Sequence, residues 1–522
     1  MSSTKTAIGS FYENRGVFVT GFTGFLGKVL VEKLLRSSPG VRIYALIRPQ
    51  GVKDARQRME TVLRDPLFDT IRAKEPDFEQ NVVAMSGDVC EPMLGLSDDD
   101  VRIIAEHVSV VFHVAATVRF DEALKVSLAL NVVGVQQTIA VAKRLPKLVS
   151  FVHVSTAYSN CDRKRIEEII YPPSIPPQKL IGSLEWMDSD MIDSLTPKLL
   201  GAHPNTYTFS KNLAEYVLVE EGGQLPFAIF RPSIVGASWK EPSPGWIDNM
   251  NGPSGLFIAA GKGLLRVMKM SPDAIADIVP VDISINMMLC IAWYTATAKP
   301  QPGLVYHCNT GTQNPCKWTK LHPIVVRTYS KYPFDNIIRR PNFSDSGNNL
   351  AYLYWRFVGH VVPAYFMDIF ARMFGKKPRM VAALGKLEKA VKTLDFFTQR
   401  SWHWTQSNGD RLLAKLSPED RKEFDFDVRS IDWTKYYEAF AVGTKKFVLR
   451  EDLANVSSAR RQIIRHRSIR LLFNVSLFLC VSSYLIKYSK WARAMVFSLV
   501  HFCLYFLSKV GLLSSSGGVP TA

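Results

Sequence analysis

The segment YTFSK contains a tyrosine and a lysine, Tyr207 and Lys211, whose types and spacing suit acid–base chemistry. On a helix, side chains four residues apart lie on one face. The Lys211 ammonium would then favour the phenolate form of Tyr207, whose pKa in water is about 10. The pair predicts a tyrosine that gives or takes a proton near neutral pH. Since this spacing is common in proteins, the surrounding sequence has to support the assignment.

Two hydroxyl side chains, Ser155 and Thr156, follow the apolar run FVHV and could assist this tyrosine. Hydroxyls at the end of a buried strand can hold a substrate oxygen on which negative charge develops. The sequence does not separate the two, and we favour Thr156 with Ser155 beside it. His113 ends another apolar run, where a packed strand-end histidine is favoured over a proton carrier.

A glycine-rich segment, TGFTGFLG, lies between a buried-strand pattern at 16–20 and the helical pattern KVLVEKLLRS. Its three glycines would allow a tight turn, close approach of the backbone to a diphosphate and close helix–strand packing, while the helix N-terminus stabilises the negative charge. This context predicts a dinucleotide cofactor rather than a structural turn. The residues expected to contact it are Thr20, Gly21, Thr23, Gly24, Phe25, Leu26 and Gly27. The bulky Phe22 stands where a small residue would be easier to place.

The end of the second strand pattern, Ala45-Leu-Ile-Arg48, predicts which dinucleotide binds. A guanidinium there attracts a 2′-phosphate, whereas an NAD enzyme would show Asp or Glu for the ribose hydroxyls. We therefore expect NADPH, the alternative for Arg48 being a solvent-exposed arginine. Asp88 follows the third strand pattern and, with Val89, could contact the adenine; its alternative is a turn aspartate.

Three further segments are expected to lie against the same cofactor. Lys211 would bind the nicotinamide ribose in addition to acting on Tyr207. Small residues after His113, and the strand-end turn RPS, would border the nicotinamide; these are Ala115, Ala116, Thr117, Pro232 and Ser233. For Pro232 and Ser233 an ordinary strand-end turn is an equal alternative.

Apolar runs of strand length alternate with helix-length segments in the first half of the chain. We expect strands at 16–20, 41–47, 82–85, 108–114, 148–154 and 227–230. Strands joined by helical crossovers form an α/β fold with a doubly wound parallel sheet of the Rossmann type. From about residue 351 the sequence becomes rich in aromatic residues with helical patterns. We therefore predict an α/β cofactor-binding domain with a substrate-binding part at 1–345, a mainly helical domain at 346–455, and a basic linker with a membrane anchor at 456–522.

Composition narrows the class of protein. Apolar residues make up 47% and charged residues 21% of the 522 residues, which excludes a mostly disordered chain. The 64 Lys and Arg against 47 Asp and Glu give a net charge of +17, which suits a nucleic acid, an anionic membrane or a phosphorylated small molecule. The seven cysteines form no CxxC pair, so neither a metal site nor a disulfide framework is expected. The first fifteen residues lack the apolar core of a secretory signal, so we expect an intracellular protein.

Taken in order, the motifs resemble those of the alcohol-forming fatty acyl-CoA reductases, a branch of the extended short-chain dehydrogenases/reductases. They are TGFTGFLG, HVAATVRF, VHVSTAYSN, YTFSK, RPSIVGASWKEPSPGWIDN and DIVPVD. Two further segments, SLEWMD and FDFDVRSIDW, also resemble the family's sequences. The likeness runs from about residue 10 to the C-terminal tail, and GASWKEP with GWIDN is its most specific part. Phe22 departs from the family pattern, which usually carries Ala or Gly there.

The resemblance implies that NADPH gives hydride to the thioester carbon of a long-chain acyl-CoA, with Tyr207 protonating or stabilising the oxygen and Thr156 or Ser155 assisting. CoA then leaves, and a retained aldehyde takes a second hydride to give a primary alcohol for ether-lipid and wax synthesis. No cysteine acyl carrier and no nucleic-acid partner are expected. The alternatives are a membrane-bound short-chain dehydrogenase acting on a secondary alcohol such as a steroid, and a catalytically inactive nucleotide-binding scaffold. Oligomeric state and chain-length preference stay open.

The tail contains an uncharged run of about 16 residues, Leu471 to Ile486, and a second apolar run, Met495 to Leu507. We expect one membrane crossing, with a hairpin or interfacial helix, or a buried helical pair, as alternatives. Five arginines between 460 and 470 would keep the preceding domains on the cytosolic side. The resemblance points to the peroxisomal membrane, with the endoplasmic reticulum as the alternative and a peroxisomal membrane-protein import factor as a candidate partner. The terminal Pro-Thr-Ala is not an SKL-type import signal, so a matrix enzyme is not expected.

Overall fold

The computed structural model of this chain describes residues 6–345 and 348–509. The chain divides into two compact units, Met1–Val456 and Ser457–Ala522. The predicted domain boundary between residues 345 and 346 lies inside the first unit. The division of this unit into a cofactor-binding and a helical domain therefore stays a prediction.

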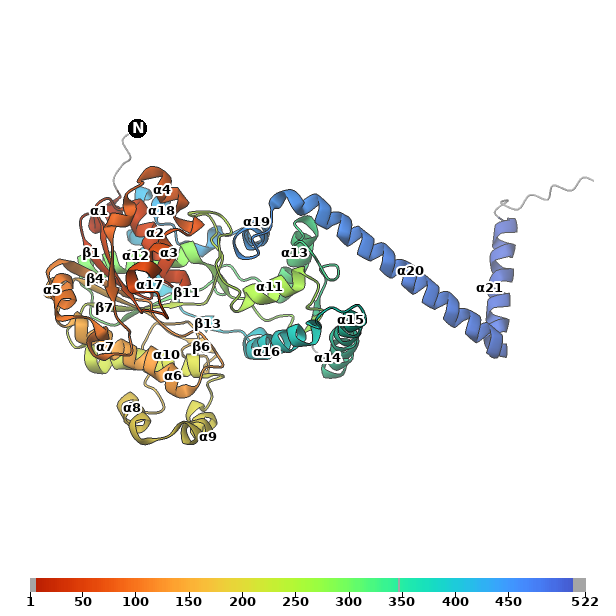
Figure 1. The fold of residues 1–522 in the computed structure, drawn as a ribbon, viewed down its shortest axis with the longest axis horizontal. Coiled ribbons are helices and arrows are strands. Elements are labelled where there is room, and N and C mark those ends of the chain that lie inside the picture. Colours follow the sequence, from red (N-terminus) through yellow and green to blue (C-terminus); the bar gives the residue numbers. More distant parts are fainter. Residues whose placement is uncertain (1–5, 346–347, 510–522) are drawn as a thin grey trace, which may run out of the picture. The chain divides into compact units, whose positions relative to one another are not determined.

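A seven-stranded parallel sheet lies at the centre of the first unit (Figure 1). Its strand order, β11-β7-β5-β4-β1-β2-β3, takes the chain outward from β1 to β3 and then back to β4 on the other side of β1. This confirms the doubly wound sheet, and all six predicted strands are present. The strands are β1 Gly16–Thr20, β2 Arg42–Ile47, β3 Val82–Ser86, β4 Val108–His113, β5 Ser150–Val154, β7 Phe227–Pro232 and the unpredicted β11 Leu304–Cys308.

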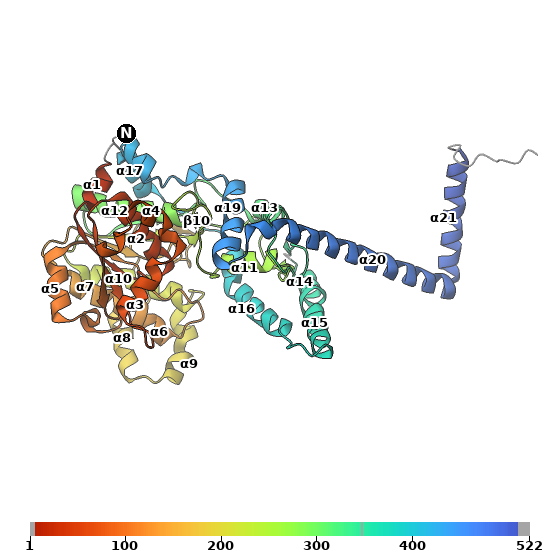
Figure 2. The same ribbon diagram turned by 45° about the horizontal axis from the view of Figure 1, so that its top comes forward.

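Helices cover both faces of the sheet, which explains why its strands are continuous apolar runs. The helices α2 Phe25–Ser37 and α12 Val281–Ala298 pack together on one face, and α7 Gly134–Ala142 and α10 Thr206–Gly222 on the other (Figure 1, Figure 2). The other helices of the first unit are α1 Ala7–Tyr12, α3 Ala55–Leu63, α4 Asp69–Lys74, α5 Asp98–His107, α6 Leu124–Leu128, α8 Pro177–Trp186, α9 Ser189–Leu200, α11 Pro253–Gly261, α13 Trp318–Lys331, α14 Asn349–Arg356, α15 Val362–Met373, α16 Met380–Thr398, α17 Ser407–Lys415, α18 Pro418–Glu423 and α19 Trp433–Gly443.

Two short strand pairs join segments after residue 340 to loops that follow strands of the central sheet. The strand β13 His403–Trp404 pairs with β6 Arg165–Ile166, and β12 Ser344–Asp345 pairs with β9 Val267–Met268. The Trp404 indole donates a hydrogen bond to the Ala157 carbonyl at 2.8 Å. Because Ala157 follows β5 by three residues, this contact fixes the loop that continues from Ser155 and Thr156. A third pair joins β8 Ile234–Gly236 to β10 Ile278–Pro280.

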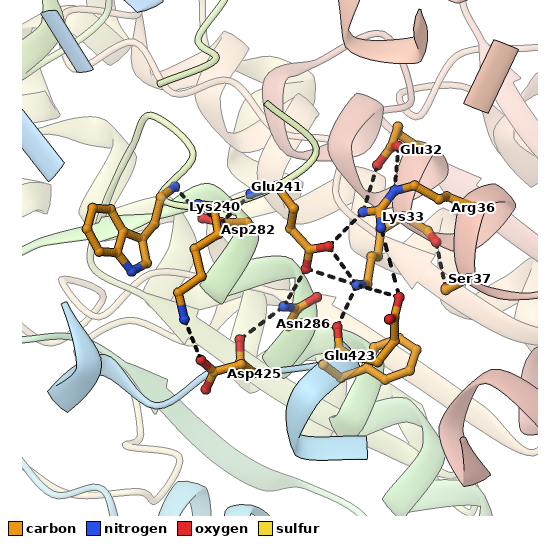
Figure 3. Close-up of polar contacts among 12 residues, drawn as sticks. Glu32, Lys33, Arg36, Ser37, Lys240, Glu241, Asp282, Asn286, Glu423 and Asp425 are labelled. Carbon is orange, nitrogen blue, oxygen red and sulfur yellow. Dashed lines mark hydrogen bonds and ion pairs between the residues drawn. The ribbon is translucent and has the colours of Figure 1, made fainter. Parts of the chain in front are cut away.

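A buried cluster of charges fixes α2, the helix that follows the glycine-rich segment (Figure 3). The Lys33 ammonium donates to both carboxylate oxygens of Glu241 at 2.9 Å, and Arg36 donates to Glu241 Oε2 at 2.8 Å. Lys33 also donates to the Glu423 carbonyl at 2.6 Å. Glu241 belongs to GASWKEP, so part of the most specific motif has a structural role.

The same motif is held from its other side by Asp282 at the start of α12 (Figure 3). The backbone amides of Trp239, Lys240 and Glu241 donate to the Asp282 carboxylate at 2.8, 2.7 and 3.1 Å. Asn286, one turn further along α12, donates to Glu241 Oε1 at 3.0 Å. The motif therefore joins the C-terminal half of α2 to α12.

In the part that the structure describes, the second unit contains α20 Val456–Tyr488, whose first residue closes the first unit, and α21 Lys490–Lys509. Three helical stretches in the described part of the chain are long and apolar enough to cross a membrane: Leu124–Ala142, Val281–Ala298 and Leu453–Tyr488. The first two are 56% and 72% buried inside the protein, whereas none of the third is buried. The apolar run after Arg470 is thus part of a longer helix that suits membrane association. The terminal Pro-Thr-Ala lies outside the described residues.

We expect Glu241→Ala to lower the free energy of unfolding by about 2–3 kcal/mol, because it removes a carboxylate from the buried Lys33 and the half-buried Arg36. The matched control Asp273→Ala breaks the exposed ion pair with Lys317 and should cost less than about 1 kcal/mol. Denaturant unfolding of the full chain in detergent, followed by tryptophan fluorescence, measures both. Equal losses would show that the buried cluster contributes no more than a surface pair.

The same comparison should depend on pH. Burial opposes ionisation of Glu241, but Lys33 and Arg36 outweigh it and hold the pKa of this carboxyl below its ordinary value. The stabilisation is therefore complete above the ordinary glutamate pKa of about 4.3 and is lost as the pH falls through the lowered folded-state pKa. The difference between the parent and Glu241→Ala should shrink in that acidic range.

Candidate active site

The glycine-rich segment connects β1 to α2 at the point where the strand order reverses. Gly21 has a φ of +76°, and a Cβ there would lie 2.6 Å from the Ala115 amide nitrogen. A Cβ on Gly27 would lie 2.2 Å from the Gly21 carbonyl oxygen. Gly24 caps α2 without a side-chain hydrogen bond, so the first amides of the helix have no side chain over them. This open helix start fits the diphosphate of a dinucleotide.

The Thr20 hydroxyl has partners within the protein, and its contact with a cofactor stays a prediction. Its hydroxyl is fully buried, accepts hydrogen bonds from the amides of Val114 and Ala115 at 3.2 Å each, and lies 2.9 Å from Nδ1 of His113. The hydroxyl therefore holds the end of β4 against the end of β1. Phe22 is also fully buried, so its ring packs into the core.

His113 is the packed strand-end residue that the sequence favoured. It is 1% exposed, and its ring stacks on His153 with centroids 5.4 Å apart. Burial, with a smaller contribution from the nearby Lys211, lowers the pKa of His113 to about 3. The imidazole is therefore neutral at pH 7 and suits packing rather than proton transfer.

Two guanidinium groups lie near the end of β2. Arg48 Nη1 is 3.4 Å from Asp88 Oδ2, and the Arg48 side chain is 61% exposed. Arg58 of α3 donates to the Arg48 carbonyl, and both burial and the Arg48 charge lower the pKa of Arg58. Asp88 also accepts the Cys90 amide at 3.1 Å, which is the turn expected as its alternative, while Val89 is mostly buried. No sequence pattern had singled out Arg58.

The segment Ala115–Thr117 joins the glycine-rich segment to α10. Ala115 packs against Gly21, and the Thr117 amide donates to Asn131 Oδ1 at 2.9 Å. Asn131 Nδ2 donates to Ser210 Oγ of α10 at 2.9 Å and to the Thr117 carbonyl at 3.2 Å. Asn131 lies in a π-helical turn, Ala129–Val133, and was missed because nothing local in the sequence marks it.

For Pro232 and Ser233 the structure favours the strand-end turn. The Pro232 carbonyl accepts the Ala157 amide at 2.9 Å, and the Ser233 amide donates to the Cys308 carbonyl at 2.9 Å. These backbone groups hold β7 between β5 and β11, and a contact of Pro232 or Ser233 with the nicotinamide stays a prediction.

Tyr207 and Lys211 lie on α10, which begins just before Tyr207. The Asn205 side chain caps the helix by accepting the Thr208 amide at 2.9 Å. Lys211 Nζ is buried and donates to the Val154 carbonyl at the end of β5, at 2.8 Å. The Tyr207 ring stacks on Phe120 with centroids 5.6 Å apart. The helix therefore presents this pair where β5 ends.

The electrostatics of the pair differ from the expected phenolate. Burial raises the pKa of Tyr207 to about 12, although a hydrogen bond with Thr156 opposes the shift. Burial lowers the pKa of Lys211 to about 8, and Glu215 opposes that shift. At pH 7 the phenol is therefore protonated and the amine mostly charged. Tyr207 is poised to give a proton rather than to take one.

The two hydroxyls that the sequence could not separate lie in different surroundings. Thr156 hydrogen bonds to Tyr207, and its Oγ1 also accepts the Tyr158 amide at 3.3 Å. Ser155 Oγ instead donates to Glu215, which also accepts Arg231 Nε at 2.8 Å and Nη2 at 2.6 Å. Ser155 thus belongs to a buried ion-pair network that sequence reasoning missed.

A mainly apolar cavity lies close to Tyr207. Phe120, which stacks on Tyr207, contacts Phe397 with ring centroids 5.4 Å apart, and Tyr158 contacts Phe397 at 5.0 Å. Phe397 and Tyr158 both line the cavity, together with Leu256 and Phe257 of α11.

Comparisons with known proteins agree with this architecture. Two family models, both described as male sterility protein, match residues 19–288 and 359–451, the first being an NAD-binding model. The reductase domain of a nonribosomal peptide synthetase from Mycobacterium tuberculosis is similar in fold, with a TM-score of 0.55 and 21% identity over 86% of this chain and 94% of that chain. The terminal reductase domain of the myxalamid pathway gives 0.54 and 19%, over 84% and 91%.

Full-length relatives are much more similar in sequence. The chain is 46% identical to fatty acyl-CoA reductase 1 of Xenopus laevis, and equally to that of Homo sapiens, over 503 residues. It is 44% identical to fatty acyl-CoA reductase 2 of Bos taurus over 502 residues. Each match covers 96% of this chain and 98% of the relative. Identity at this level along almost the whole length means that the chain belongs to the fatty acyl-CoA reductase family.

Proposed function

We propose that this protein reduces long-chain fatty acyl-CoA to a primary fatty alcohol with NADPH. The observation that carries the proposal is the place of Tyr207. Its phenol, whose neutral form burial favours, hydrogen bonds to Thr156 after the end of β5, and its ring stacks on Phe120, which contacts Phe397 at the wall of the apolar cavity. In balance, the thioester, two NADPH and two protons give the alcohol, free CoA and two NADP⁺. The secondary-alcohol dehydrogenase and the inactive scaffold are disfavoured by the full-length identity and by the intact Tyr207 and Lys211.

The protein's own groups act on the substrate oxygen. Bound NADPH would supply the hydride for each of the two reductions. Tyr207 would donate a hydrogen bond to the thioester oxygen, stabilise the charge that develops there, and then protonate the aldehyde oxygen. Thr156 would hold the phenol and the same oxygen. Lys211, fixed by the Val154 carbonyl, would hold the nicotinamide ribose and keep positive charge beside the phenol.

A preference for NADPH over NADH is supported by charge near the end of β2. Arg48 and Arg58 provide two guanidinium groups where a 2′-phosphate would lie, and the strand ends without a carboxylate of its own. Asp88 partly neutralises Arg48, so a bound phosphate would compete with this carboxylate.

The acyl chain is assigned to the apolar cavity. The reacting carbon must lie near Tyr207, and the ring of Phe120 connects Tyr207 to Phe397 at the cavity wall. Asp277, a charged residue of this wall, is satisfied by the Thr310 and Gly311 amides at 2.8 and 2.9 Å. The remaining lining is mainly aliphatic and aromatic, as a hydrocarbon chain requires.

The cellular setting is a proposal that follows from the tail and the family. The unburied apolar part of α20 would cross the membrane once, and the arginines before it would keep the first unit cytosolic. The family resemblance favours the peroxisomal membrane, with the endoplasmic reticulum as the alternative, and a role in ether-lipid and wax synthesis. A peroxisomal membrane-protein import factor would then deliver the chain.

Tyr207→Phe should lower kcat/KM for acyl-CoA about 10³-fold and leave NADPH binding unchanged, because it removes only the proton donor. Thr156→Ala should lose about 10²-fold, and Thr156→Ser should recover most of that loss. The measurement is CoA release alongside NADPH oxidation, in a ratio of one to two. Full turnover by Tyr207→Phe would show that another group donates the proton.

Arg48→Ala and Arg58→Ala should each raise the KM for NADPH about tenfold and leave the KM for NADH nearly unchanged, because only NADPH carries the 2′-phosphate. The control Arg56→Ala removes an exposed arginine of the same helix, paired with Glu60, and should change neither value. Similar effects on both cofactors would contradict the assignment.

Leu256→Trp should fill part of the cavity and shift the preferred acyl chain towards shorter lengths. Each methylene that no longer fits costs about fourfold in kcat/KM, since burying one contributes about 0.8 kcal/mol. Ile258→Trp is the control, because Ile258 lies on the same helix but does not line the cavity. The test is kcat/KM across acyl-CoA lengths, and an unchanged profile for Leu256→Trp would place the acyl chain elsewhere.

A further inference from the structure

The helices α14 and α15, with the π-helical turn Phe357–Val361 between them, expose many large apolar side chains although they belong to the first unit. We call this region the α14–α15 surface. Its side chains that are 52–72% exposed include Trp355, Phe357, Phe366, Phe370, Met373 and Phe374. A cluster of this size on a soluble protein marks a contact with another apolar phase or partner.

These helices differ from a typical surface helix, which buries its apolar face and exposes its polar one. On α15 the buried residues are Ala364 and Asp368, one turn apart. The Asp368 carboxylate accepts the amides of Arg379, Met380 and Val381 at 2.8–2.9 Å and so caps the start of α16. Polar groups therefore attach α15 to the protein, while its large apolar side chains point outward.

The preceding turn is attached in the same way. His360 is 6% exposed, and its Nε2 accepts the Arg266 amide at 2.8 Å. Phe357, three residues earlier, is 59% exposed. Because the inward contacts are hydrogen bonds between specific groups, the outward orientation of the apolar residues is fixed by the fold.

We propose that the α14–α15 surface rests on a lipid bilayer as an interfacial contact that does not span it, in addition to the contact made by α20. The helices have 8 and 12 residues, about half of the ~20 needed for a crossing. Their Trp and Tyr residues suit the boundary between headgroups and hydrocarbon. Lys376, Lys377 and Arg379, all exposed, follow α15 directly and would lie among anionic headgroups.

Two observations favour lipid over a protein partner. The apolar helix α20 begins at Val456, where the first unit ends, so its anchoring would keep the first unit beside a bilayer. The exposed residues also combine aromatic side chains with neighbouring lysines and arginine, whereas the core of a protein interface is depleted of lysine.

The α14–α15 surface also adjoins the cavity assigned to the acyl chain, a point that rests on the proposed function. The helix α14 packs on β9, whose Met268 lines the cavity, and α16 contributes Leu394 and Phe397. A bilayer contact here would let an acyl chain pass between lipid and cavity with little exposure to water.

Photo-crosslinking of the full chain in vesicles tests the proposal without relying on activity. Benzoylphenylalanine would replace Phe366 or Phe370 in turn, and Trp186 of α8, 69% exposed, would be the matched aromatic control. The vesicles contain phosphatidylcholine and phosphatidylserine at about four to one, and adducts are identified by mass spectrometry. We expect at least tenfold more lipid adduct at 366 and 370 than at 186.

Other adducts would overturn the proposal. Crosslinks from 366 or 370 to a second copy would show that the surface is a dimer contact, and crosslinks to peptides of α20 or α21 in the same chain would show that the tail covers it. Lipid adducts no more frequent than at 186 would show that it faces water. Because all three replaced residues are exposed, unfolding midpoints equal to that of the parent chain verify that each variant is folded. A chain that binds lipid here but forms no alcohol would leave this inference intact and contradict only the proposed function.

Discussion

The buried ion pair between Glu215 and Arg231 is the interaction on which the reaction centre depends. Both side chains are fully buried, and Glu215 also accepts hydroxyl hydrogen bonds from Ser155 and Ser159. Arg231 donates as well to the carbonyls of two loop residues, at 3.2 and 2.8 Å. Such a pair is tolerated in the core only because its hydrogen-bonding capacity is used, and losing one partner would strand a charge. Since Glu215 is one turn from Lys211, the pair positions α10 against β5 and β7.

The glycine-rich segment is held by a separate set of contacts, which reaches α10 through Ala115, Thr117 and Asn131. Gly21 leaves room for Ala115, and Asn131 then connects the next residues to α10. On the far side of the sheet, Glu241 fixes α2 through Lys33 and Arg36 (Figure 3). Part of the most family-specific sequence, Glu241 in GASWKEP, therefore positions the helix that follows the glycine-rich segment. The glycine-rich segment and the Tyr207–Lys211 pair are shared by many dehydrogenases, whereas the GASWKEP segment that supports α2 is specific to the family.

The sequence predicted well those features that are local or periodic. Strands buried on both faces are continuous apolar runs in the sequence, so six strands were predicted, whereas β11, which follows the long apolar helix α12, was missed. The glycine-rich segment and the spacing of Tyr207 and Lys211 could likewise be recognised in the sequence. The hydrogen-bond partners of residues at strand ends could not be predicted, because these partners lie on neighbouring strands or the segments that follow them. Thr20 and Ser233 are examples. Arg58, Asn131 and Glu215 likewise acquire their roles through partners distant in sequence, and the pKa of Tyr207 depends on burial that no motif records.

The raised pKa of Tyr207 follows from the same requirement that shapes the rest of the site. A substrate with a charged headgroup and a hydrocarbon chain needs a polar surface and an apolar one to meet at the reacting carbon, and Tyr207 stacks on the aromatic ring that borders the apolar side. Burial there favours the neutral phenol, which would be unsuitable for removing a proton from an alcohol at pH 7. It suits reduction, because the proton has to move from the protein to the substrate oxygen. With a pKa of about 8, Lys211 stays largely charged at neutral pH. As the pH rises, a larger fraction of Lys211 loses its charge and can no longer help Tyr207 to regain the proton that it gave to the substrate.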